Sequence, residues 1–327
     1  MLSLTNSYTD DDMRHIDREI RRVLTPLRYS VTIRSALTTL LDHPGKRFRP
    51  MLVTLAYRLV NPYDLQLPDP VIKLAAAIEL IHSASLIHDD IIDSAELRHG
   101  RPAFYKEFGT EVAIPVGVLL YSVSLNLLAQ IGDIDAIRRV SRAVDQLCVG
   151  ELDQVMSRNR FDLTVTEYLL VLKKKTSALF ALSAWGGVRL AGGDMVLSGD
   201  AFQFGNSLGL LFQVSDDMLD FSGQENELNK DAFQDFLLGE ITLPMIMLLR
   251  SVGSDDNHEI RRIMETRDWA KLPWLIERFM ASKAVDQCAE LVDVYESRCV
   301  TFLEKFEKSP IRDDLARIVG YISHRAG

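Results

Sequence analysis

The sequence predicts an all-α protein, and three observations support this fold class. Apolar residues recur at helical spacing along almost the whole chain, no alternating apolar and polar runs lie between hairpin turns, and two similar acidic motifs each end an apolar helix. Of the 327 residues, 47% are hydrophobic and 25% are charged, as in folded globular proteins. Because no low-complexity linker or repeat divides the chain, we interpret residues 1–327 as one domain.

The N-terminal part predicts helices separated by proline and glycine. Residues 12–41 carry apolar side chains at helical spacing, DHPG at 42–45 interrupts them, and GKRFRP at 45–50 opens the next helix. After a proline-rich loop, Asp69 is the expected N-cap of a helix with Pro70 at its first position. Apolar and small residues surround that helix, so we expect it to lie inside a bundle and to continue as far as the glycine at position 100.

Residues 113–132 contain no charged side chain over 20 residues, which is long enough to span a bilayer. Pro115 and Asn126 lie within this stretch, and its flanks are Glu111 and Asp133 rather than lysine or arginine. We therefore interpret it as a central buried helix of a protein without a membrane span. Later helices are expected between breaks at 186–187, 192–194, 222–231 and 253–257.

Composition excludes several classes of function. The net charge of −9 argues against nucleic acid as the main partner, which requires a basic face. Cys148, Cys288 and Cys299 are too few and too scattered for a disulfide framework or a zinc site, so we expect a reducing, cytoplasmic setting. The N-terminus has neither the basic nor the apolar region of a signal peptide.

The two acidic motifs are DDIID at 89–93 and DDMLD at 216–220. In each, the first and last carboxylates are four residues apart on one helix face, where like charges repel. A cation would relieve this repulsion, and a set of oxygen ligands without histidine or cysteine suits Mg²⁺, which often bridges carboxylates to substrate phosphates. One such motif alone is more often a solvated helix end, but two copies favour a site. The candidate metal ligands are Asp89, Asp90, Asp93, Asp216, Asp217 and Asp220.

A magnesium–diphosphate site also needs cationic side chains. The lysine and two arginines of GKRFRP are one candidate group, because guanidinium binds phosphate bidentately. Taken alone, each basic residue is more often solvated, and a lone histidine is more often a core residue. The remaining candidates are His82, Arg98, Lys175 and Lys230.

Together these motifs resemble the trans-polyprenyl diphosphate synthases, head-to-tail prenyltransferases of the isoprenoid synthase fold. The resemblance implies an all-α bundle of antiparallel helices around a deep central cavity, usually in a homodimer. The matching segments, which follow the family order, are GKRFRP (45–50), the region 81–102, GELDQ (150–154), KKTSALF (174–180), the region 204–221, NKDAFQD (229–235) and GEITLP (239–244).

The resemblance also implies roles for individual residues. Asp89, Asp93 and Asp216 would bind Mg²⁺, three ions per active site, with the other three motif aspartates in support. The residues matching contacts to isopentenyl diphosphate are Lys46, Arg49 and His82, with His99 at the position of a further contact. Those matching contacts to the allylic diphosphate are Arg98, Lys175 and Lys230, and Thr176 and Gln213 match polar groups near the developing cation. In this chemistry the allylic diphosphate ionises, the isopentenyl double bond attacks the cation, and the departing diphosphate accepts the proton, so no side-chain nucleophile is required.

The chain departs from the family pattern at four positions. His99 stands in place of a second arginine and Glu240 in place of a lysine, while Phe233 replaces a glycine and Val118 an aspartate. A histidine is mostly neutral at pH 7 and a glutamate reverses the charge. We therefore expect weaker binding of isopentenyl diphosphate or an altered partner arrangement.

Product length is expected to depend on side chains beside the first motif. Ala84 and Ser85, five and four residues before Asp89, are small, and Leu125 stands where a bulky floor residue is common. Side-chain volume and the resemblance together predict a product of roughly C25 to C50, with C20 as the alternative. A class I terpene cyclase would need a different second motif, a non-catalytic partner subunit typically loses the aspartates, and an all-α interaction protein would not explain the spacing.

Overall fold

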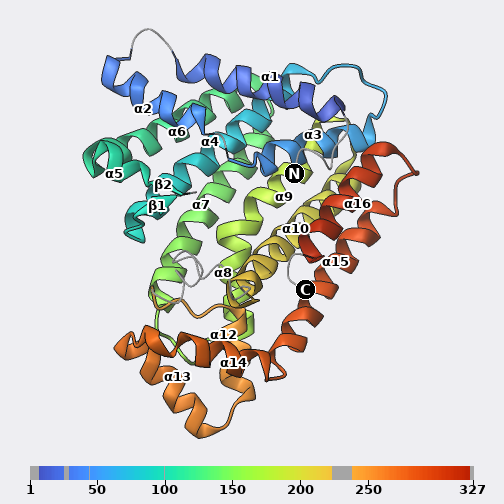
Figure 1. The fold of residues 1–327 in the computed structure, drawn as a ribbon. Helices are drawn as coiled ribbons and strands as arrows, with labels where there is room; N and C mark the ends of the chain where they lie inside the picture. Colours follow the sequence, from blue (N-terminus) through green and yellow to red (C-terminus); the bar gives the residue numbers. More distant parts are fainter. Residues whose placement is uncertain (1–6, 26–28, 44, 99, 223–237, 325–327) are drawn as a thin grey trace. The chain divides into compact units, whose positions relative to one another are not determined.

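A computed structural model describes residues 7–25, 29–43, 45–98, 100–222 and 238–324, and it confirms the all-α fold class (Figure 1). The only strands among these residues are β1 (Leu97–Arg98) and β2 (Arg101–Pro102), which form an antiparallel hairpin. The contacts divide the chain into two units. The first unit comprises residues 1–145, 179–205 and 305–315, and the second comprises 146–178, 206–304 and 316–327.

Most of the helices lie within a single unit, either the first or the second, and three long helices continue from one unit into the other. The interpretation of the chain as one domain therefore stays a prediction. The helices of the first unit are α1 (Ser7–Leu24), α2 (Val31–Asp42), α3 (Phe48–Val60), α4 (Asp69–Ile92), α5 (Phe104–Phe108), α6 (Thr110–Ile131) and α9 (Ala178–Leu190). The shared helices are α7 (Ile134–Ser157), α10 (Met195–Ser222) and α16 (Pro310–Ser323). The second unit contains α8 (Val165–Leu172), the π-helical turn η2 (Lys173–Ser177), α12 (Leu243–Ser251), α13 (Ser254–Thr266), the 3₁₀ turn η3 (Trp269–Lys271), α14 (Leu272–Met280) and α15 (Ala284–Leu303).

The predicted segment 12–41 forms two helices, α1 and α2, rather than one. Thr25 follows α1 directly and precedes a proline in the sequence. The helical conformation is disfavoured for a residue that precedes proline, because the two residues clash. A buried ion pair holds α1 against α3, because Asp12 accepts hydrogen bonds from Arg58 Nε at 2.6 Å and Nη2 at 2.7 Å. The N-terminal helix is therefore an integral part of the first unit.

Helix α4 lies in the core of the first unit, as predicted, but its ends differ from the prediction. Pro68 is the N-cap, so Asp69 is the first helical residue instead of the cap. The helix ends at Ile92, well before residue 100, because Ser94 adopts a left-handed conformation with φ of 54° and the Ala95 N–H donates to Asp90 O. This early end makes room for the β1–β2 hairpin directly after the first acidic motif.

Helices α4 and α6 pack against each other along their lengths, and both are long and apolar enough to cross a membrane by length and composition. In α4, 61% of the most apolar 18-residue window is buried, as in the core helix of a soluble protein, but in α6 only 39% is buried. Ile114, Val118 and Leu125 are about half exposed on the α6 face turned away from the core. The prediction of a central buried helix at 113–132 is therefore confirmed for the helix itself, but this face is not buried within the chain.

Candidate active site

In the first unit, the first acidic motif lies where α4 meets the β1–β2 hairpin. Asp90 is buried, and its Oδ1 accepts a hydrogen bond from Arg98 Nε at 2.9 Å and forms an ion pair with Arg98 Nη2 at 2.7 Å. Asp89 and Asp93 are partly exposed. The hairpin therefore brings Arg98 to the motif, and the middle carboxylate anchors it there.

The GKRFRP segment forms a turn before α3, and its three basic residues take different roles. Arg47 adopts a left-handed conformation with φ of 50° and pairs with Glu79 at 2.9 Å and Asp17 at 3.3 Å. Arg47 therefore fixes the turn on α4 and α1 and does not face a substrate. Lys46, beside it, is exposed.

Arg49 is the member of this basic group whose Nε atom is buried, although the residue as a whole is partly exposed. Its Nη1 donates to His82 Nε2 at 2.8 Å, and its guanidinium lies 4.8 Å from the centre of the Phe180 ring. Burial lowers the pKa of Arg49 to about 10, an effect that the negative charge of Glu79 opposes. The Nε donor of Arg49 is buried and has no acceptor among the described residues, so the residue retains a donor for a ligand.

In the second unit, Lys175 and Thr176 lie on the π-helical turn η2, an element found frequently at functional sites. Lys175 Nζ pairs with Glu151 Oε2 of α7 at 2.5 Å. Two glycines allow neighbouring helices to approach the turn: a Cβ atom at Gly150 of α7 would lie 2.7 Å from Lys175 N, and one at Gly209 of α10 would lie 2.7 Å from Ser177 Cα.

The second acidic motif connects to this turn through α10. Asp217 is buried and accepts hydrogen bonds from Tyr168 Oη at 2.5 Å and from Gln213 Nε2 at 2.9 Å. Gln213 Oε1 in turn accepts a hydrogen bond from Thr176 Oγ1 at 3.1 Å. The structure thus brings together Asp217, Gln213 and Thr176, while Asp216 remains partly exposed.

The two acidic motifs share one structural feature. In each, the middle aspartate is buried and accepts hydrogen bonds from protein donors, which gives Asp90 and Asp217 a supporting role. No cluster of three or more histidine, cysteine, aspartate or glutamate side chains among the described residues could hold a metal ion by itself. The exposed carboxylates are hard oxygen ligands, so they fit Mg²⁺ that completes its coordination with diphosphate and water.

Several predicted residues lie outside the described part of the chain. They are Lys230, His99 and Phe233, and the side chain of Asp220 is likewise not described. Glu240 is described and is buried, with Gln154 Nε2 donating to one carboxylate oxygen and Arg158 Nη2 lying 3.3 Å from the other. Its negative charge is therefore neutralised within the second unit.

The predicted chain-length residues occupy different environments. Ala84 is fully buried in α4, and Ser85, which is partly exposed, donates a hydrogen bond to His82 O. Leu125 is 51% exposed on α6. Its role as the floor of a cavity beside α4 stays a prediction.

Sequence reasoning did not assign Glu79, Glu151 or Tyr168. The role of Glu79 could have been predicted, because it lies three residues before His82 in an apolar helix. A buried carboxylate in such a helix needs a cationic partner. Glu151 lies in the GELDQ segment, but its ion pair with Lys175 depends on how α7 packs against the π-helical turn, which the sequence does not reveal. No pattern in the sequence connects Tyr168 with Asp217.

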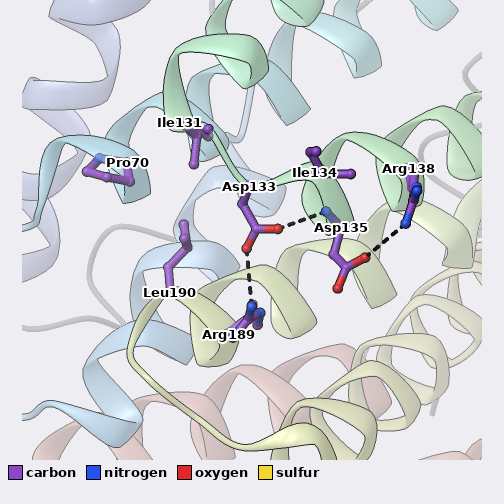
Figure 2. Close-up of a pocket in the computed structure, with 9 residues that line it drawn as sticks. Pro70, Ile131, Asp133, Ile134, Asp135, Arg138, Arg189 and Leu190 are labelled. Carbon is purple, nitrogen blue, oxygen red and sulfur yellow. Dashed lines mark hydrogen bonds and ion pairs between the residues drawn. The ribbon is translucent and has the colours of Figure 1, made fainter.

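Figure 2 shows a pocket of about 730 Å³ in the first unit, lined by the ends of α6 and α9 and the starts of α4 and α7. It lies beside Pro70, whereas the first motif begins at Asp89 near the other end of α4, about 28 Å away along the helix. Its charges are paired internally, with Asp133 3.5 Å from Arg189 and Asp135 3.8 Å from Arg138. This pocket is separate from the site around the first motif.

Known proteins resemble the chain over nearly its full length. A heptaprenyl diphosphate synthase component 2 of Geobacillus stearothermophilus is 33% identical over 321 residues, covering 98% of this chain and 97% of the relative. A crystal structure of a decaprenyl diphosphate synthase from Rhodobacter capsulatus has a TM-score of 0.89 at 26% identity, covering 97% of each chain. The structure of a polyprenyl synthase from Caulobacter crescentus CB15, complexed with calcium and isoprenyl diphosphate, has a TM-score of 0.88 at 29% identity, covering 97% of this chain and 96% of the other.

The likeness to these structures confirms the isoprenoid synthase fold. The family model described as polyprenyl synthetase matches residues 30–277, which include both acidic motifs, the GKRFRP turn and the π-helical turn. The chain therefore belongs to the polyprenyl synthetase family.

Proposed function

We propose that the protein is a magnesium-dependent trans-prenyltransferase that condenses isopentenyl diphosphate with an allylic diphosphate to a medium- or long-chain polyprenyl diphosphate. One observation carries the proposal. Each unit contains an acidic motif near the C-terminal end of an apolar helix, and its middle carboxylate is bound to protein donors. Asp89 and Asp93 of the first motif and Asp216 of the second are partly exposed. A cationic side chain accompanies each motif, Arg98 in the first unit and Lys175 in the second.

The residues divide into two groups with different tasks. Arg49, His82 and Lys46 bind the diphosphate of the isopentenyl substrate, and the buried Nε of Arg49 supplies one of the donors. Arg98, Lys175 and Lys230 bind the allylic diphosphate. The side chains of Thr176 and Gln213 orient their oxygen atoms toward the developing positive charge.

Asp89, Asp93 and Asp216 are the proposed magnesium ligands, three ions in all, with Asp90, Asp217 and Asp220 in support. When bound, magnesium ions withdraw electron density from the allylic diphosphate and weaken its C–O bond. Burial raises the pKa of the Cys288 thiol to about 12, so this thiol is protonated at neutral pH and is no nucleophile. The chemistry accordingly depends on cationic side chains and on apolar helices that exclude water from the carbocation.

We propose a product of roughly C25 to C50, with geranylgeranyl diphosphate (C20) as the alternative. The fully buried Ala84 and the small Ser85 leave space along α4, and similar proteins include synthases of heptaprenyl and decaprenyl diphosphate. Replacing Ala84 by Phe fills this space and should shorten the product. Mass analysis of the products would contradict the argument if chain length stayed unchanged.

The apolar face of α6, formed by Ile114, Val118 and Leu125, supports a proposed homodimer. The alternative is a weakly active subunit of a heteromeric synthase, which the relative named as a component 2 favours. A reducing, cytoplasmic setting is a further proposal and rests on three free cysteines, two of them buried.

The experiment that tests the proposed function uses the purified chain with Mg²⁺, isopentenyl diphosphate and each allylic primer in turn, followed by mass analysis of the products. We expect a polyprenyl diphosphate with at least one primer, and no product when EDTA removes the metal. Absence of product with every primer would contradict the proposal for the chain alone and would favour the heteromeric alternative.

A further inference from the structure

The β1–β2 hairpin carries two arginines directly opposite each other. Its register pairs Arg98 with Arg101, and Leu97 with Pro102. Opposite residues of an antiparallel pair lie on the same face, with Cβ atoms about 5 Å apart, and like charges in this position repel. Two guanidinium groups so placed are stabilised when each has an anionic partner of its own.

The two arginines differ in their partners. Arg98 is held by Asp90 through a hydrogen bond from Nε at 2.9 Å and an ion pair with Nη2 at 2.7 Å. Arg101 is exposed, and none of the described residues forms an ion pair with it. Its Nη1 instead donates to Nε2 of His43. The charge of Arg101 is therefore not neutralised by any described carboxylate.

The hydrogen bonds of His43 define its tautomer. Its Nδ1 lies 3.0 Å from Thr39 O, and because a carbonyl only accepts, the proton is on Nδ1. His43 Nε2 is then the acceptor that orients one arm of the Arg101 guanidinium. The other N–H groups of Arg101 donate to no described residue, so they remain for a ligand.

The position of His43 indicates which ligand this is. His43 lies three residues before Lys46, so their Cα atoms are at most about 11 Å apart. Lys46 and Arg49 of the same segment are the residues to which the proposed function assigns the isopentenyl diphosphate. The tip of Arg101 therefore contacts the segment that leads to Lys46 and Arg49, while Arg98 is paired with Asp90 of the first acidic motif.

We propose that Arg101 is a binding residue for the diphosphate group of the isopentenyl substrate, an inference that rests on the proposed function. Guanidinium binds phosphate oxygens through two parallel, charge-assisted hydrogen bonds, which a neutral histidine cannot do. The chain thus carries its second hairpin arginine at position 101, next to a histidine at 99. This placement offsets the loss of charge that the histidine causes.

Steady-state kinetics on Arg101→Gln tests the proposal, with Arg138→Gln as the matched control. Arg138 is an exposed arginine of α7 that pairs loosely with Asp135 and has no role in the proposed site. For Arg101→Gln we expect the KM for isopentenyl diphosphate to rise about tenfold, with the KM for the allylic substrate and kcat little changed. Arg101→Lys keeps the positive charge but cannot form two parallel hydrogen bonds, so it should recover part of the affinity for isopentenyl diphosphate.

Calorimetric titration with isopentenyl diphosphate gives a second readout that does not need turnover. We expect about tenfold weaker binding by Arg101→Gln and unchanged binding by Arg138→Gln. The proposal is overturned if Arg101→Gln binds like the wild type, or if only its KM for the allylic substrate rises. Failure of the wild type to form product from any primer would contradict the proposed function, whereas the titration would still decide the role of Arg101.

Discussion

At the scale of single residues, the buried charges of this protein are paired locally. Arg47 binds Glu79 and Asp17, and Asp90 binds Arg98. The sequence predicted that basic residues would accompany the acidic motifs, but it could not separate Arg47 from Arg49. The separation depends on the left-handed conformation of Arg47, which turns its side chain back toward α4, and no local pattern encodes that turn.

Glu240 illustrates how a departure from the family pattern is accommodated. The sequence suggested an unpaired negative charge near a diphosphate, but the structure pairs Glu240 with Arg158 and Gln154 in a buried cluster. Replacing Glu240 by Lys places two positive charges together and should lower the free energy of unfolding by about 3 kcal/mol. Glu240→Gln should cost less because it retains the hydrogen bond with Gln154.

Urea denaturation of the two variants measures this difference directly. If Glu240→Lys were as stable as the wild type, the Arg158–Glu240 pair would have no structural role, and the charge at position 240 would have to be explained by substrate binding.

At the scale of elements, the π-helical turn η2 positions Lys175 and Thr176, two candidate site residues of the second unit. Two glycines make room for it, Gly150 on α7 and Gly209 on α10. Gly150→Ala should displace the backbone at Lys175 and reduce kcat about 10-fold to 100-fold, because small misplacements of binding groups are costly. Gly199→Ala is the matched control, since a Cβ atom at this glycine of α10 meets nothing within 4 Å.

Turnover and thermal unfolding of both variants check this prediction. We expect Gly199→Ala to retain activity and to gain up to about 1 kcal/mol in stability from its higher helix propensity. Equal kcat for Gly150→Ala and wild type would show that the turn tolerates the displacement.

Helix α8, which leads into the turn, begins with a capping box of Thr164 and Glu167. Hydrogen bonds from the Thr164 backbone and side chain, then from Arg160, lower the pKa of Glu167 from 4.5 to about 2. Because the pKa is lower in the folded state, the ionised carboxylate stabilises the fold above pH 4.5, and this contribution is lost as the pH falls toward about 2.

Glu167→Gln should therefore lower the melting temperature at pH 7, and the difference from the wild type should diminish between pH 4.5 and 2. Thermal unfolding followed by circular dichroism across this range measures the effect. A difference independent of pH would mean that the charge of Glu167 does not contribute.

Sequence periodicity predicted that nearly every element is a helix, but it did not predict where α4, the helix that carries the first acidic motif, begins and ends. The early end of α4 depends on Ser94 in a left-handed conformation, which serine adopts rarely and no pattern announces. The hairpin that follows, with its opposed arginines, was missed for the same reason. Likewise, the π-helical turn depends on glycines from two other helices and is not a local property of its own sequence.

At the scale of the whole molecule, the proposed self-association depends on the face of α6 formed by Ile114, Val118 and Leu125. The lack of charge in this stretch predicted a central buried helix, yet these three side chains are about half exposed within the chain. An exposed apolar face of this kind favours self-association.

Ile114→Asp should convert the proposed homodimer to monomers, as measured by light scattering coupled to size-exclusion chromatography. Val31→Asp, at an exposed apolar residue at the start of α2, is a control that should leave the mass unchanged. A wild type that is itself monomeric, or an Ile114→Asp variant that remains dimeric, would contradict the assignment of this face.

The proposed function requires both acidic motifs to hold magnesium for one diphosphate. Calorimetric titration with inorganic pyrophosphate measures this in the wild type, in Asp89→Asn and in Asp216→Asn, each with and without Mg²⁺. We expect binding by the wild type that requires Mg²⁺ and that either substitution weakens strongly. Binding that is independent of Mg²⁺, or that survives the loss of one motif unchanged, would contradict it.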